Sequence, residues 1–346
     1  MTFFTLLFAL AFEQWRPLKL DNPAYRAVQY AAAWLEDHMD VGDQRHGRWA
    51  WWGLVGGICL GVYVIYLVLY WLLPPLAFVW NVAVLFMTLG FRQFSHYYTD
   101  IQFALSEGDL PAARGLLHAW KAEPSSNAGH NAASTDSTQF NTEDLSLSEI
   151  VRHTLIEALL ASHRHVFGVL LCFVLLPGPL GAVLYRLANY LARRWNRERA
   201  NLQINDPTKP RAKQATNTFG CYAQRAFEVI DWLPARVTAF VFAVVGNFED
   251  AIYCWKTCVT SHQHASFNRS SPSSQAILLA AGEGAMGVQI TESPSTIYAA
   301  TEENGNAWRG ASPSLVSLKA GVGMVWRAII LWFILILFIS IAYCVG

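Results

Sequence analysis

Charged residues are scarce in this chain of 346 residues. Asp, Glu, Lys and Arg make up 14% of it, whereas 53% of the residues are hydrophobic, and the mean hydropathy is positive. A soluble protein of this size carries more charge, because water must solvate its whole surface. The composition therefore excludes an ordinary soluble domain and favours a polytopic membrane protein.

Other features are absent as well. The 25 basic and 25 acidic residues give a net charge of zero, which offers no basis for nucleic-acid binding. The six cysteines are scattered, and three lie within apolar runs, so a secreted disulfide framework is excluded. The chain has no P-loop, dinucleotide-binding fingerprint, H-E-x-x-H or G-x-S-x-G motif. No motif indicates a nucleotide, and the cofactor is unknown.

Long apolar runs are the main feature that is present. A membrane span needs about 20 mostly apolar residues, and residues 49–73 and 324–345 satisfy this. Pro74-Pro75 predicts a break before a second run, 76–90. Residues 166–191 could cross once, or enter and turn at Pro177-Gly178-Pro179. Residues 237–246 could span only if their helix starts near Ile230. We expect an all-α polytopic integral membrane protein with about four or five transmembrane helices and amphipathic cytoplasmic helices.

The chain can be divided by composition into five segments. Residues 1–90 are predicted as N-terminal membrane helices, the first of them a short helix that is retained, because no basic region precedes it. Residues 91–150 are predicted as a soluble helical hairpin and a flexible linker. Residues 151–265 form the membrane core, 266–320 a polar region rich in Gly and Ser, and 321–346 a C-terminal transmembrane helix.

Basic residues gather just after the third apolar region. By the positive-inside rule this loop is cytoplasmic. We expect a multi-pass protein of the bacterial inner membrane. The residues are Arg193, Arg194, Arg197, Arg199, Lys209, Arg211 and Lys213.

A second group of charges precedes the apolar run 237–246. Arg225, Glu228 and Asp231 are spaced three apart, which predicts that they share one helix face. Pro234 is suited to begin the next helix, which places Arg236 one turn inside it. Two interpretations stay open, and both could hold. Trp232 and Arg236 could anchor a helix end at the lipid headgroups, or the charges could bind an anionic or amide-rich ligand.

Histidine and arginine crowd the entrance to the third apolar region, in the stretch from Arg152 to His165. His163 and His165 do not converge on one helix face, so recognition of phosphate or carboxylate is favoured over a metal site. Cys254, Cys258 and His262 are spaced four apart and could suit zinc, but on a continuous helix the outer two lie about 12 Å apart. We interpret these cysteines as incidental side chains at a membrane edge and predict no metal site.

Several short motifs resemble the membrane-embedded CobD/CbiB family of cobalamin biosynthesis. They are Phe219-Gly220, Arg225, Glu228 and Leu233-Pro234-Ala235-Arg236, the box Ala281–Val288, the run Gly178–Ala182 with Tyr185-Arg186 and Asn189, and Gly108-Asp109-Leu110. The opening Met1–Leu7 and Asp231-Trp232-Leu233-Pro234-Ala235-Arg236 resemble the related AmpE proteins, which are proposed modulators of β-lactamase induction. The CobD/CbiB resemblance implies amide attachment of an aminopropanol arm to a corrinoid.

The resemblance also implies an acidic and amide set for ligase chemistry, and this set is largely missing here. Of the family pattern E-x-x-x-E-N-x-x-D only Glu157 matches, because Ala161, Ser162 and His165 occupy the later positions. The family pair D-D survives only as Glu228. The retained boxes thus favour membership of the family, while the lost carboxylates predict eroded catalysis.

We therefore predict a CobD/CbiB-family membrane protein, possessing ligase chemistry only if other residues have replaced the acidic set. The alternative is a non-catalytic, AmpE-like membrane regulator of envelope or β-lactamase signalling. The predicted catalytic residues are Glu228, Asp231 and Glu157, and the predicted substrate-binding residues are Arg225, Arg236, His163, His165 and Asn189. The expected partners are a corrinoid or another small molecule and the lipid bilayer, with protein partners unknown.

Overall fold

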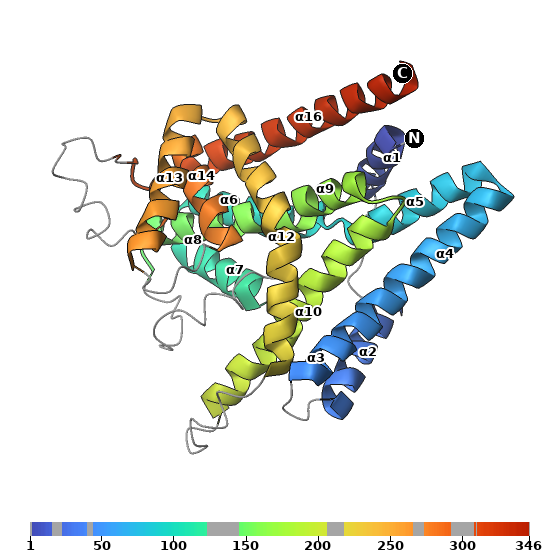
Figure 1. Cartoon of the computed structure of the whole chain (residues 1–346). Coiled ribbons are helices and arrows are strands. Elements are labelled where there is room, and N and C mark those ends of the chain that lie inside the picture. The colour runs from blue at the N-terminus through green and yellow to red at the C-terminus, as the bar shows by residue number, and fades with distance from the viewer. Residues whose placement is uncertain are drawn as a thin grey trace. The chain divides into compact units, whose positions relative to one another are not determined.

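The computed structural model describes residues 2–15, 23–39, 44–122, 145–205, 218–265, 273–291, 308 and 310–345. Throughout these ranges the regular elements are helices, with one isolated bridge between Val288 and Ala311, which confirms the predicted all-α fold. The helices are α1 Thr2–Trp15, α2 Pro23–Met39, α3 Gln44–Trp51, η1 Trp52–Gly56, α4 Gly57–Leu72, α5 Pro74–Thr88, α6 Phe91–Glu107, α7 Leu110–Ala122, α8 Leu147–Ser162, η4 His163–Phe167, α9 Gly168–Leu175, α10 Leu180–Asn205, α12 Thr218–Val245, α13 Phe248–Ala265, α14 Ser274–Met286 and α16 Leu315–Val345 (Figure 1).

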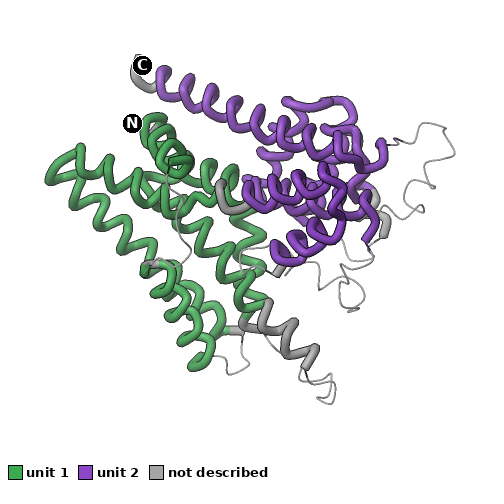
Figure 2. Tube along the Cα trace, turned by 180° about the vertical axis from the view of Figure 1, so that it is seen from behind, with its two compact units in different colours: residues 1–92, 128–136, 164–231 green, residues 93–127, 137–163, 232–346 purple. Residues whose placement is uncertain are grey.

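The chain divides into two compact units, coloured green and purple in Figure 2. Unit 1 comprises residues 1–92, 128–136 and 164–231, and unit 2 comprises residues 93–127, 137–163 and 232–346. In unit 1, α5 packs against α1 and α4, and α10 packs against α9 and α5. In unit 2, α13 packs against α14, and α8 contacts α7, α14 and α16. The predicted division into five segments stays a prediction.

Three helical stretches among the described residues are long and apolar enough to cross a membrane: Arg45–Leu72, Leu147–Leu175 and Leu315–Ala342. The first and third confirm the spans predicted near residues 49–73 and 324–345. Two further apolar helices, Phe3–Trp15 and Pro74–Thr88, are shorter. The predicted number of crossings and the predicted cytoplasmic side of the basic loop stay predictions.

The second candidate span differs from the predicted one. We expected residues 166–191, whereas the stretch is Leu147–Leu175. The chain then turns at residues 176–179, which confirms the alternative of a turn at Pro177-Gly178-Pro179, and α10 begins at Leu180. Because residues 152–165 include several polar side chains, we had expected the span to start only after them, which is too late in the sequence. Most residues of this stretch are buried inside the protein, so their polarity does not require exposure to water.

Pro234 was predicted to begin a helix, and this prediction is wrong. It lies inside α12, which runs without a break from Thr218 to Val245. A proline in a helix interior removes one backbone hydrogen bond. Here Phe227 and Asp231 before the proline and Ala235 and Ala239 after it are buried, and Thr238 Oγ1 donates to the Pro234 carbonyl over 2.8 Å. Packing on both sides of the proline therefore keeps the helix continuous.

The predicted break at Pro74-Pro75 is confirmed, and two further helix ends have a clear local cause. Leu73 is extended between α4 and α5, and Pro74 and Pro75 occupy the first positions of α5. Asp109 Oδ1 accepts a 3.0 Å hydrogen bond from the Ala112 N–H at the start of α7. Gly287 has φ +66° and ends α14 in a left-handed conformation that glycine adopts without strain. The predicted linker at residues 124–144, and most of the polar region outside 273–291 and 310–314, lie outside the described residues.

Candidate functional site

A buried polar cluster in unit 1 is centred on Asp231, near the middle of α12. The Tyr185 hydroxyl on α10 donates a 2.7 Å hydrogen bond to Asp231 Oδ1. Arg164 in η4 is 1% exposed, and its positive charge acts on Tyr185. A π-turn such as η4 widens the helix locally and is frequent at functional sites. Asp231, a predicted catalytic residue, thus lies in a buried environment with a phenol donor.

The phenol of Tyr185 is held in its protonated form. Burial, followed by the negative charge of Asp231, raises the pKa of Tyr185 well above its ordinary value. The hydroxyl is therefore a hydrogen-bond donor at neutral pH, and the acceptor is the carboxylate. The Tyr185 donor fixes the position of the carboxylate, and a positioned carboxylate is one of the groups that can act as a general base.

Beside this pair, Arg186 on α10 contacts His165 in η4. The distance from Arg186 Nη1 to His165 Nδ1 is 2.6 Å. A guanidinium has only donors, so Nδ1 must be the acceptor, and the imidazole is the neutral tautomer with its proton on Nε2. His165, a predicted binding residue, is therefore in contact with Arg186, which was not among the residues predicted to bind a ligand.

Acidic and phenolic groups also act on Arg186. Burial lowers the pKa of Arg186, and Tyr25 on α2 and Glu13 on α1 oppose this shift. Asn189 lies one turn further along α10 and is buried, and within the described residues its Oδ1 has no hydrogen-bond partner. A buried amide oxygen without a partner costs free energy. The predicted binding role of Asn189 therefore agrees with an acceptor that a ligand could satisfy.

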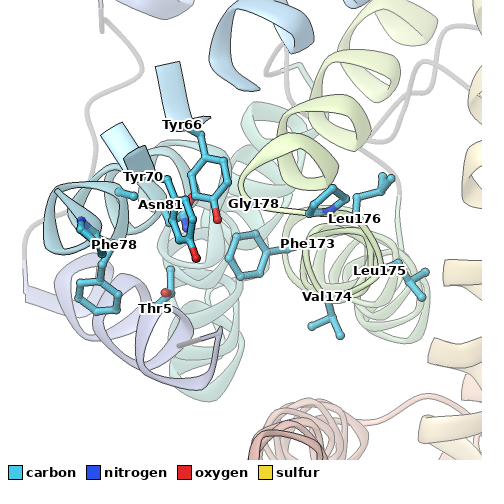
Figure 3. Close-up of a pocket in the computed structure, with 13 residues that line it drawn as sticks. Thr5, Tyr66, Tyr70, Phe78, Asn81, Phe173, Val174, Leu175, Leu176 and Gly178 are labelled. Atoms are coloured by element: carbon cyan, nitrogen blue, oxygen red, sulfur yellow. The ribbon is translucent and has the colours of Figure 1, made fainter. Parts of the chain in front are cut away.

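A cavity of about 430 Å³ lies in the same unit, where the α4–α5 turn faces the turn after α9. Figure 3 shows Tyr66, Tyr70 and Asn81 close together in the view, with Phe78 and Thr5 to their left and Phe173 to their right. The volume is in the range of small-molecule sites, and mainly apolar walls with a few polar groups are typical of them. The cavity can hold an apolar ring or part of a larger ligand.

Glu157 and His163, two further predicted residues, lie in unit 2. Glu157 on α8 is 1% exposed, and its negative charge acts on Lys121 at the end of α7. Burial lowers the pKa of Lys121 to about 8, with Glu157 opposing and Arg152 reinforcing the shift. His163 is buried as well, and its Nδ1 lies 3.0 Å from Thr238 Oγ1. Because Thr238 donates to the Pro234 carbonyl, the histidine is the donor in this contact.

The sequence analysis missed a buried carboxyl in unit 2. Glu283 on α14 is 2% exposed, and its Oε2 accepts hydrogen bonds from the hydroxyl and the N–H of Thr291. Among the described residues its Oε1 has no partner. Burial raises the pKa of Glu283 to about 7, and Thr291 opposes the shift. The signal was a single acid inside the small, apolar box Ala281–Val288.

Arg225, Glu228 and Asp231 do not share one face, and that prediction is wrong. Arg225 and Glu228 are exposed, whereas Asp231 is buried. Three residues advance a helix by about 300°, so each step falls 60° short of a full turn. Asp231 therefore lies about 120° around the helix from Arg225. Gln224 donates a 2.9 Å hydrogen bond to Glu228. The functional roles predicted for Arg225 and Glu228 stay predictions.

Arg236 folds back onto the helix that carries it. Its guanidinium carbon lies 4.2 Å from the Trp232 ring centroid, and Nη1 donates a 3.0 Å hydrogen bond to the Trp232 carbonyl. A cation over an indole ring is a favourable contact. This geometry agrees with the anchoring interpretation of the pair, and the predicted binding role of Arg236 stays a prediction.

The zinc alternative gains no support from the described residues. They contain no group of three or more metal-ligating side chains close enough to share an ion. Burial raises the pKa of Cys254 to about 12 and of Cys258 to about 11, and Glu283 adds to both shifts. Zinc binds the thiolate, which these surroundings disfavour. The side chain of His262 lies outside the described part of the chain.

The fold and these clusters define an all-α membrane protein with buried charged side chains. A sequence model of the family described as CobD/Cbib protein matches residues 17–314, which is most of the chain. The chain therefore belongs to the CobD/CbiB family, and the resemblance found in the short motifs is confirmed.

Two curated proteins are similar over long alignments. The "Cobalamin biosynthesis protein CobD" of Stutzerimonas stutzeri is 26% identical over 311 residues, covering 88% of this chain and 86% of that protein. The protein of the same name from Chromobacterium violaceum is 28% identical over 260 residues, covering 75% and 70%. No solved structure matches the chain. These findings do not favour the AmpE-like alternative.

Proposed function

We propose that this protein acts in cobalamin biosynthesis, as a multi-pass protein of the bacterial inner membrane that attaches an aminopropanol arm to a corrinoid through an amide. Its family membership supports the pathway, as do two relatives that carry the name of cobalamin biosynthesis proteins. Three candidate spans support the location.

The buried Tyr185–Asp231 hydrogen bond, with Arg164 acting on it, is the observation that carries the proposal. Charged side chains in the interior of a membrane protein are costly to bury and usually mark functional sites. The carboxylate and the phenol supply a base and a donor without the acidic pattern that the family resemblance implies. Tyr185 and Asp231 are therefore proposed to take the roles of the acidic residues that this chain lacks at the positions of the family pattern.

The remaining groups of unit 1 suit different parts of a corrinoid. Arg186 is only partly buried, and its fork of N–H groups is suited to a carboxylate. Asn189 would bind an amide side chain through its Oδ1, which has no hydrogen-bond partner in the described part of the chain. The cavity between Tyr66, Tyr70 and Phe173 would receive an apolar portion of the ligand. In unit 2, Glu157 and His163 stay proposed site residues, as does Arg236.

Amide formation imposes a requirement of its own. Joining a carboxylate to an amine expels one carboxylate oxygen, so a phosphoryl or nucleotidyl donor must activate the acid first. The chain has no P-loop, so no residues are assigned to binding this donor. The donor is added in the assay as ATP with Mg²⁺.

The test uses membranes that contain the full chain, incubated with cobyric acid, aminopropanol, ATP and Mg²⁺. The proposal predicts a corrinoid product heavier by one aminopropanol less one water, detected by mass spectrometry. Asp231→Asn should abolish this product, while Asp37→Asn, at an exposed aspartate of the same unit, should leave it unchanged. Absence of the product from well-inserted wild-type protein would refute the proposed reaction.

A further inference from the structure

The cavity of unit 1 has an uncharged lining with one polar side. No charged side chain occurs among the described residues that line it. Most of its walls are apolar, and side-chain hydrogen-bonding groups come from Thr5, Tyr66, Tyr70 and Asn81. An unpaired charge is far more costly to bury than an apolar group. The cavity is therefore suited to a neutral molecule rather than to a phosphate, a carboxylate or an ammonium.

The polar side presents an acceptor and a donor next to each other. A side-chain hydrogen bond joins Tyr66 on α4 to Asn81 on α5, and Figure 3 shows the two side chains close together. Within the described ranges Asn81 Oδ1 is buried and has no hydrogen-bond partner. The amide NH₂ of Asn81 is therefore the donor in this bond, and the phenol oxygen is the acceptor. The O–H of Tyr66 and the Oδ1 of Asn81 are then available to a ligand.

A hydroxyl group matches both of these atoms. It has one donor and two acceptor lone pairs, so it can donate to Asn81 Oδ1 and accept from the Tyr66 O–H. An ester or ether oxygen has no donor and would leave the buried Asn81 oxygen without a partner, which costs free energy. The polar side therefore selects an alcohol over an ester, an ether or an ion.

The cavity also lies near the end of a candidate membrane span. Tyr66 and Tyr70 belong to the last two turns of Arg45–Leu72, and the ends of membrane spans lie at the level of the lipid headgroups. Leu175, which lines the cavity, is 57% exposed, and Tyr70 is 52% exposed. A chain of methylene groups can therefore leave the cavity over apolar side chains that face the surroundings of the protein.

We propose that this cavity binds an uncharged lipid alcohol. Its hydroxyl lies between Asn81 Oδ1 and the Tyr66 phenol, and its acyl chain lies against Phe173 and Leu175. A monoacylglycerol and a diacylglycerol both have this chemistry. The proposed function places an apolar portion of the corrinoid in the same cavity, so the lipid competes with that ligand. This competition rests on the proposed function, whereas the hydroxyl site does not.

The test measures binding of three oleoyl compounds to the purified full chain by native mass spectrometry, in a detergent whose headgroup has no hydroxyl. 1-Oleoylglycerol should bind about tenfold or more tightly than methyl oleate, which has the same chain but no donor for the buried acceptor. Oleate should also bind more weakly than 1-oleoylglycerol, because its carboxylate would enter an uncharged lining. Equal affinities for the three compounds would overturn the proposal.

Two variants remove the two partners of the hydroxyl. Asn81→Leu removes the acceptor at similar volume, and Tyr66→Phe removes the donor and keeps the ring. Each should weaken 1-oleoylglycerol by about tenfold, and Asn81→Leu should leave methyl oleate unchanged. The matched control is Tyr63→Phe, one turn earlier on α4 at a residue that does not line the cavity. It should bind all three compounds like the wild type.

Melting temperatures identify variants that fail to fold. Tyr66→Phe removes a single oxygen atom, so it carries the test if Asn81→Leu does not fold. Affinity for 1-oleoylglycerol equal to that of the wild type, in either folded variant, would overturn the hydroxyl site.

Addition of cobyric acid tests the competition. Excess cobyric acid should displace 1-oleoylglycerol from the wild type, and retained binding of the lipid would overturn the shared use of the cavity. The measurements with the three oleoyl compounds involve neither corrinoid nor turnover. The hydroxyl site can therefore fail while the amide product forms, and it can hold while the product is absent, so the two proposals are tested separately.

Discussion

Tyr185 and Asp231, separated by 46 residues in the sequence, form a 2.7 Å hydrogen bond inside unit 1. Tyr185 is fully buried and Asp231 is 3% exposed. If one partner of such a pair is removed, the other stays buried without a hydrogen bond, and the free energy of unfolding falls by the desolvation cost of that group. The relationship therefore makes stability and proposed function depend on the same two side chains.

Replacement of the phenol tests the structural part of this statement. Tyr185→Phe removes the donor to Asp231 and should destabilise the protein by about 1–3 kcal/mol, the cost of an unsatisfied buried acceptor. The measurement is thermal unfolding followed by tryptophan fluorescence. Tyr30→Phe, at a tyrosine that is 75% exposed, should leave the melting temperature unchanged. Equal melting temperatures for both variants would contradict a buried Tyr185–Asp231 bond.

The position of the phenol depends on Gly168 in α9. A Cβ at this residue would overlap the Tyr185 ring. Gly168→Ala should therefore displace the ring and cost about 1–3 kcal/mol, as overpacking usually does. Gly61→Ala, where an added Cβ meets nothing, should be neutral or slightly stabilising. Thermal unfolding of the two variants gives the comparison, and a neutral Gly168→Ala would refute the close approach.

The Arg186–His165 contact can be tested by a double-mutant cycle. Arg186→Met and His165→Phe should each destabilise unit 1, while the double variant should lose less than the sum by about 1–3 kcal/mol. Denaturant unfolding supplies the free energies. The pair Arg48→Met and His165→Phe uses an exposed arginine of the same unit and should be additive. Additivity for both pairs would show that the 2.6 Å contact contributes nothing.

Glu283 predicts a pH dependence of stability. Its pKa rises from 4.5 to about 7 on folding because of burial, so the folded state binds this proton more tightly than the unfolded state. The resulting stabilisation is fully present below pH 4.5 and is lost as the pH rises to about 7. The difference is about 3 kcal/mol, at about 1.4 kcal/mol per pKa unit.

The measurement for Glu283 is the melting temperature of the purified protein between pH 4.5 and pH 8. Glu283→Gln should remove part of the slope, because glutamine does not titrate. Glu249→Gln, at an exposed carboxyl, should retain it. A slope that is identical in wild type and Glu283→Gln would contradict the raised pKa.

Much of the fold could be predicted because apolar runs and prolines act locally. The span near residues 49–73, the break at Pro74 and the C-terminal helix each follow from a few neighbouring residues. The second span could not be placed correctly, because the sequence shows that Arg164 and His165 are polar but not that they are buried. The prediction at Pro234 was wrong for a similar reason. Packing of the neighbouring residues outweighs the tendency of proline to begin a helix.

The site could be predicted only in part. Asp231 was selected as a polar residue near a membrane segment, and its catalytic role stays a prediction. Its contact with Tyr185 spans 46 residues, and no local pattern encodes it. The different exposure of Asp231 and Arg225 was within reach, because helical geometry alone separates them. Glu283 was also within reach, as the single acid in a box of small residues. The roles of Glu157 and His163 stay predictions.

The most direct test of the account is growth rescue by the intact chain. A bacterial strain without its own CobD/CbiB ligase is fed cobyric acid and expresses wild type, Asp231→Asn or Asp37→Asn, with membrane insertion verified by immunoblot. The account predicts rescue by wild type and Asp37→Asn and none by Asp231→Asn. Equal rescue by all three would contradict the proposed role of Asp231, and no rescue by well-inserted wild type would contradict the proposed function.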